Sequence, residues 1–119
     1  MASYTRIEQF SISLDVCSVG GEVAVSAYLR TLDGSPVPGR TLRFIRLDAL
    51  TVLWEQPTSA EGYMGRYWSP DREQLGVHGY YLAFPGDSEY EGTTSLLIYL
   101  TVRETAYGFV IGTPVVRPA

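Results

Sequence analysis

Two residue types are missing from this chain of 119 residues, which contains no lysine and no asparagine. Without asparagine the chain has no acceptor for N-glycosylation. Without lysine it has no amine for a Schiff base and no phosphate-loop lysine, so two common kinds of active site are excluded. The same absence excludes an isopeptide cross-link between a lysine and an asparagine or aspartate side chain.

Cysteine and histidine occur once each, as Cys17 and His78. One cysteine cannot form an internal disulfide, and one of each cannot supply the three or four nitrogen and sulfur ligands of a zinc site. Cys17 follows an alternating segment and precedes two glycines, which favours a half-buried structural thiol over an intermolecular disulfide. His78 lies in a loop that leads into a predicted strand, with no nucleophile-elbow sequence in the chain. We therefore expect no catalytic residues, no cofactor and no enzyme activity.

Basic charge is also scarce. Nine arginines stand against thirteen acidic residues, so the net charge is −4. This balance argues against nucleic acid as a partner, because phosphate binding needs a concentrated basic face. Arg40, Arg43 and Arg46 do cluster, but their spacing places them on different faces of a strand and Asp48 follows. We interpret them as a solvated strand edge.

Long apolar runs are absent as well, and none approaches the ~20 residues of a membrane-spanning helix. We expect no membrane insertion. Residues 1–6 lack the basic start and apolar stretch of a signal peptide. This leaves three interpretations, namely a cytoplasmic protein, a phage product, or a surface protein whose signal has been removed. The length predicts a single domain.

Alternation of apolar and polar residues is the dominant pattern that is present. It runs through residues 10–17, 23–30 and 96–102, and each run has one apolar face. Such runs indicate strands with one buried and one solvated side, as in antiparallel sheets. The apolar faces contain Phe10, Ile12, Leu14 and Val16 in the first run, Val23, Val25, Ala27 and Leu29 in the second, and Leu96, Ile98, Leu100 and Val102 in the third.

Turn residues divide the rest of the chain. Further strands are predicted at 41–48, 52–56, 63–68 and 80–84, and Pro70 begins a single helical turn over 71–75. Seven strands at this spacing predict an all-β fold, a sandwich of two sheets.

Two segments carry a family resemblance, DGSPVPGRTLRF at 33–44 and GYYLAFPGDSEYEGTTS at 79–95. Together they resemble the immunoglobulin-like repeat domains of bacteria and archaea over residues 5–102. Such domains occur in surface adhesins, S-layer and stalk proteins, and phage structural proteins. The resemblance implies an immunoglobulin-like antiparallel β-sandwich with Tyr81 and Phe44 as core anchors. Ala83 stands where an antibody domain has its second cysteine, so the chain is not of the antibody type.

Two groups of residues are candidates for binding. Asp87, Glu89 and Glu91 could offer three carboxylates to a calcium ion, although a solvated acidic loop is the favoured interpretation. Tyr63, Tyr67 and Trp68 form an aromatic cluster that is typical either of a binding surface or of a cap on the core.

Residues 103–119 do not fit the repeat pattern, so we divide the chain into a sandwich over 1–102 and a C-terminal extension over 103–119. The extension is apolar, and we expect Tyr107, Phe109 and Ile111 to make its contacts. It could return as an eighth strand, or it could be an assembly arm that adds a strand to a neighbour.

The sequence therefore supports two functional hypotheses. The first is a non-enzymatic structural or assembly module that contacts protein, either other copies of itself or a neighbouring coat protein. It would lie on a virion, as a coat or decoration protein, or on a cell surface. The alternative is a carbohydrate-binding or adhesive module from a larger secreted protein, with the aromatic cluster as the sugar platform.

Overall fold

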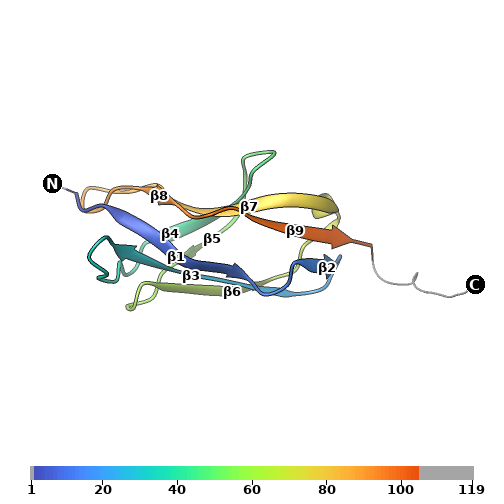
Figure 1. The fold of residues 1–119 in the computed structure, drawn as a ribbon, viewed down its shortest axis with the longest axis horizontal. Helices are drawn as coiled ribbons and strands as arrows, with labels where there is room; N and C mark the ends of the chain where they lie inside the picture. Colours follow the sequence, from blue (N-terminus) through green and yellow to red (C-terminus); the bar gives the residue numbers. More distant parts are fainter. Residues whose placement is uncertain (1, 105–119) are drawn as a thin grey trace, which may run out of the picture.

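The computed structural model describes residues 2–104, which form two β-sheets packed face to face (Figure 1). The small sheet has the strand order β1 (Thr5–Ile12), β3 (Val23–Thr31) and β6 (Tyr63–Trp68). The large sheet has the order β2 (Val16–Ser18), β9 (Ile98–Arg103), β7 (Gly76–Phe84), β4 (Thr41–Arg46) and β5 (Thr51–Pro57), and the short β8 (Thr93–Thr94) pairs with β7. The predicted all-β sandwich is confirmed.

The first predicted strand is in fact two strands in different sheets. β1 pairs with β3, whereas β2 runs parallel to β9 in the large sheet. The crossing between the sheets reverses the alternation, so Leu14 and Val16 are exposed and Cys17 is buried. The prediction that these two apolar residues share a buried face with Phe10 was therefore wrong. Burial also raises the pKa of the Cys17 thiol, which makes it a structural rather than a reactive group.

Phe44 lies at the centre of an aromatic cluster and is fully buried, which confirms it as a core anchor. Its ring stacks on Trp54 at 4.6 Å and on Tyr80 at 5.2 Å between centroids, and Trp68 meets it edge-on at 5.0 Å. Stacked and edge-on aromatic pairs contribute beyond the area that they bury. The cluster joins the two sheets, because Trp68 comes from the small sheet and the other three rings from the large one.

The second predicted anchor was displaced by one residue. Tyr80 is fully buried, whereas Tyr81 points to the outer side of the large sheet and is only partly covered. The cause is the alternation along β7, which places Tyr80 on the same side as Leu82 and Phe84. The Tyr80 hydroxyl donates a hydrogen bond of 2.8 Å to Gln74 Oε1. Gln74 belongs to the predicted helical turn, which the structure forms as a 3₁₀ helix, η1 (Arg72–Gln74).

Candidate interaction surfaces

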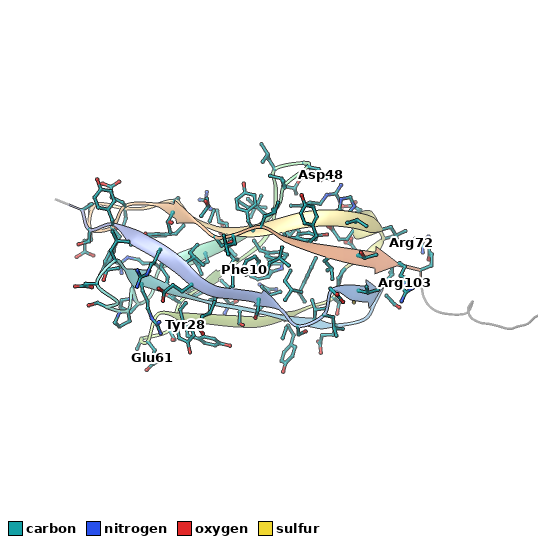
Figure 2. The ribbon with its side chains drawn as sticks, in the orientation of Figure 1. Phe10, Tyr28, Asp48, Glu61, Arg72 and Arg103 are labelled. Carbon is teal, nitrogen blue, oxygen red and sulfur yellow. The ribbon has the colours of Figure 1, made fainter. Side chains whose placement is uncertain are left out.

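The outer side of the small sheet carries three tyrosines, and we call it the tyrosine face. The register places Tyr28 of β3 opposite Tyr63 of β6, and Tyr67 lies four residues further along β6 (Figure 2 labels Tyr28). The Tyr28 and Tyr63 rings are 5.1 Å apart, tilted at 56°. Tyr67 is 71% exposed. Two of the three aromatic residues named from the sequence, Tyr63 and Tyr67, therefore lie on one surface.

A hollow of about 290 Å³ separates Tyr63 from Tyr67. Small residues line it, because Ala24, Ser26 and Gly65 face outward there. The end of the Tyr63 ring lies over Gly65, where a Cβ atom would be 2.5 Å from the Tyr63 hydroxyl. Because every other residue type has a Cβ atom, only glycine at position 65 allows the Tyr63 ring to lie where it does.

Trp68 does not belong to the tyrosine face. It follows Tyr67 directly, so the alternation of β6 turns it inward against Phe44 and Tyr80. The aromatic cluster therefore divides between the surface and the core. Tyr63 and Tyr67 are at the surface, and Trp68 caps the core.

Part of the outer side of the large sheet presents uncharged, mostly aliphatic side chains, next to the Arg43–Glu55 ion pair on the same side. We call it the apolar face and define it by Leu47, Val52, Val77, Tyr81, Leu97 and Tyr99. The register places Tyr99 beside Gly79, and it aligns Tyr81, Ile45 and Val52 across three strands. Tyr99 is 58% exposed, and Val77 is exposed to a similar degree. Contiguous exposed apolar surface of this kind marks contact sites in soluble proteins.

Gly79 and a hollow shape the apolar face. A Cβ atom at Gly79 would lie 3.0 Å from Leu97 Cδ1 and 3.2 Å from Tyr99 Cε1, so both side chains pack closely over this glycine. Leu47, Tyr81 and Leu97 line a hollow of about 340 Å³ together with Thr94 and Ser95. Leu47 begins the loop of the β4–β5 hairpin, and this loop projects from the large sheet (Figure 1). The sequence signal that could have found this face is the second tyrosine of the Tyr80–Tyr81 pair.

The acidic loop after β7 is organised around an arginine. Arg40 Nε donates to Asp87 Oδ2 at 2.8 Å, its guanidinium also binds Glu89, and it lies 5.0 Å from the Tyr90 ring centroid. Arg40 thereby joins the two segments that carried the family resemblance. It also holds the pKa of Asp87 below its usual value, with help from the main-chain N–H of Glu89. Two of the three candidate calcium ligands are thus already bound to a cation of the chain.

The remaining arginines of the cluster at 40–46 are paired too. Arg43 binds Glu55 at 2.9 Å and Arg46 binds Asp48 at 2.5 Å. Within residues 2–104, no group of three or more His, Cys, Asp or Glu side chains is arranged to hold a metal ion.

His78 is held at both ring nitrogens. Nδ1 is 2.7 Å from Asp48 Oδ2, in the β4–β5 hairpin, and Nε2 is 2.9 Å from the Leu75 carbonyl oxygen (Figure 2 labels Asp48). A His–Asp pair can activate a nucleophile only through the second ring nitrogen. In this chain Nε2 is bound to the Leu75 carbonyl oxygen. The contacts of His78 therefore connect the loop of the β4–β5 hairpin to the residue that follows η1.

The described part of the chain ends just after β9. Arg72 of η1 binds both carboxylate oxygens of Glu104, at 2.8 and 2.6 Å, and Val19 N donates to Arg103 O at 2.8 Å. Arg72 and Arg103 lie at the same end of the molecule (Figure 2). The last strand ends at Arg103, one residue beyond the predicted boundary. Tyr107, Phe109 and Ile111 lie outside the described residues. The part of the chain that the structure describes holds no helix of the length and hydropathy needed to cross a bilayer.

Comparison by sequence finds no match, either among protein-family models or among curated proteins. Comparison by structure finds the D00-D0 domain of intimin, with a TM-score of 0.59 and 8% identity over 85% of this chain and 50% of that one. The chain thus spans about half the length of the intimin fragment. The CARDB domain of the PF1109 protein from Pyrococcus furiosus is similar as well.

The solution NMR structure of that CARDB domain gives a TM-score of 0.56 at 15% identity, over 83% of this chain and 94% of that one. A crystal structure of the same domain in complex with di-metal ions gives 0.55 at 15% identity, over 82% and 86%. Likeness at such low identity concerns the fold. The chain is an immunoglobulin-like β-sandwich.

Proposed function

We propose that this chain is a non-enzymatic structural or assembly module that contacts protein, and that it does so through the apolar face. Its setting would be a virion, as a coat or decoration protein, or a cell surface. The observation that carries the proposal is the contiguous uncharged surface around Tyr81, Leu97 and Tyr99. Burial of such a surface stabilises a complex by about 25 cal/mol per Å² of apolar area.

The partner that we propose is a second copy of the chain. Each copy has a net charge of −4, so association through a charged surface would be opposed by repulsion. The apolar face avoids this cost, because Arg43 and Glu55, which border it, neutralise each other. The segment 105–119 would extend the contact as an assembly arm, in keeping with its apolar composition.

The test is sedimentation velocity of the full chain over a range of concentrations. We expect concentration-dependent association, weakened at least tenfold by Tyr99→Asp, because the substitution would bury a carboxylate in the contact. Tyr67→Asp is the matched control, since it places the same charge at an exposed tyrosine on the opposite sheet. A strictly monomeric chain, or equal weakening by both variants, would contradict the proposal.

A further inference from the structure

The tyrosine face has a regular arrangement that the contact proposed for the apolar face does not use. Strand register sets it out in rows that cross the small sheet. One row contains Tyr28 and Tyr63, the next contains Ser11, Ser26 and Gly65, and the third contains Ala24 and Tyr67. Aromatic rows therefore flank a row of small side chains. Tyr63 and Tyr67 are four residues apart, which separates their Cα atoms by about 13 Å in an extended strand.

The rings and the floor between them offer two kinds of contact. Tyr63 lies over Gly65 and remains 41% exposed, so part of its ring is open to solvent, as is most of the Tyr67 ring. The Ser11 and Ser26 hydroxyls lie 3.1 Å apart, and each can donate and accept hydrogen bonds. A ligand that fits both must present C–H groups to the rings and hydroxyls to the floor.

The charges around the face indicate that this ligand is neutral. Glu8 binds both Arg6 and Arg30, the second at 2.9 Å, and Arg30 also stacks on Tyr28 at 4.4 Å. Arg66 lies over the Trp54 ring at 4.5 Å, on the inner side of β6. These guanidinium groups are thus already engaged by a carboxylate or an aromatic ring. On the outer face, Arg6 and Arg30 share the single carboxylate of Glu8, which leaves one net positive charge, whereas a polyanion needs a concentrated basic face.

We propose that the tyrosine face is a binding site for a neutral polysaccharide, with Tyr63 and Tyr67 stacking on sugar rings and the serine row bonding their hydroxyls. Gly65 is a positioning residue, because it lets the Tyr63 ring lie down on the sheet. The hollow of about 290 Å³ lies near the lower end of the size range of small-ligand sites. This binding is independent of the association proposed for the apolar face.

Affinity electrophoresis of the full chain tests the proposal, in native gels that contain xyloglucan, galactomannan, amylopectin or dextran, with polygalacturonate as the acidic comparison. We expect retardation by at least one neutral polymer and none by polygalacturonate. Tyr67→Ala and Tyr63→Ala should each weaken binding at least tenfold. Gly65→Ala should also weaken it, although it removes no ring, because the added Cβ displaces Tyr63.

Tyr4→Ala is the matched control, since Tyr4 is 67% exposed and belongs to neither the tyrosine face nor the apolar face, so the substitution should leave retardation unchanged. Thermal unfolding of each variant shows whether the fold is retained, and all of these positions are on the surface. The proposal is overturned if no neutral polymer retards the chain, if polygalacturonate retards it more strongly, or if the Tyr63→Ala/Tyr67→Ala double variant still binds. None of these results bears on self-association, which sedimentation velocity of the Tyr99→Asp variant tests separately.

Discussion

At the scale of single residues, the buried tyrosine has the clearest chemical consequence. Among residues 2–104, Tyr80 is the largest fully buried side chain, and its burial raises the pKa of its phenol to about 12. Because the folded pKa is raised, the resulting stabilisation is complete below the ordinary value of 10 and is lost as the pH rises toward 12. A shift of about two units corresponds to roughly 3 kcal/mol.

Tyr80→Phe tests this consequence. At neutral pH we expect a loss of roughly 1–3 kcal/mol, since Gln74 Oε1 loses its buried donor. Between pH 10 and 12, however, the variant should lose less further stability than the wild type. Urea unfolding at pH 7, 10 and 11.5 measures both effects. Equal alkaline losses in the two proteins would show that Tyr80 is not the titrating group.

Replacing the two core anchors predicted from the sequence, Phe44 and Tyr81, should reduce the free energy of unfolding by different amounts. Phe44→Ala removes the centre of the aromatic cluster and should destabilise the chain by roughly 3–5 kcal/mol, close to the whole stability of a small domain. Tyr81→Ala should cost clearly less, because its ring lies on the outer face. Denaturant unfolding measures the free energy of unfolding of both variants. Equal losses of stability would show that the Tyr81 ring is part of the core after all.

The same residues show how far sequence reasoning reaches. Phe44 was predicted because it stands in a central strand without a tryptophan. The motif spacing predicts Tyr81 in the core, but the alternation of Tyr80, Leu82 and Phe84 sets the side on which each residue lies, and it turns Tyr81 outward. Tyr63 and Tyr67 share a face by the same period of two. Their partner Tyr28 could be found only from the register between β3 and β6.

At the scale of elements, the positions of strands and turns along the chain were predictable from the sequence. Which strands pair with one another was not. The segment 63–68 was predicted with the bounds that β6 has. The crossing between β1 and β2 left no local signal, because the alternation of apolar and polar residues continues from β1 through the three-residue β2. The loops that carried the family resemblance are structural. Val37 of the first loop is fully buried, and Arg40 fastens this loop to the second.

The stabilisation that the Arg40–Asp87 ion pair gives to the contact between these loops should depend on pH. Arg40 lowers the pKa of Asp87 below its ordinary value of 3.8, so its stabilisation is present above that value and is lost as the pH falls through the folded pKa. Asp87→Asn removes the charge and keeps an oxygen to accept from the Glu89 and Tyr90 N–H groups. We expect a lower melting temperature than wild type at pH 7, and a difference that closes below about pH 3.8. A difference that stays constant from pH 7 to pH 2 would exclude the ion pair as its cause.

At the scale of the whole molecule, both sheets and the core belong to residues 2–104. Truncation after Glu104 should therefore leave a folded domain with the far-ultraviolet circular dichroism of a β protein and with weaker self-association. Circular dichroism and sedimentation of the truncated and full chains measure this. A truncated chain that fails to fold would instead identify the extension as an internal strand.

The two faces of the sandwich divide the proposed functions between them, with protein contact on the large sheet and sugar contact on the small one. The sequence alone supports both hypotheses, but it could not separate the two proposed contacts in space. That separation depends on which tyrosines lie on which sheet, with Tyr63 and Tyr67 on the small one and Tyr81 and Tyr99 on the large one.

Hydroxyl-radical footprinting of the unmodified chain at rising concentration tests the central claim most directly, because it reports the burial of individual side chains. We predict that labelling of Leu47, Leu97 and Tyr99 falls as the chain associates, while labelling of Tyr67 stays constant. Association with unchanged labelling at Leu97 and Tyr99, or with protection of Tyr67 in their place, would contradict the assignment of the apolar face as the protein contact.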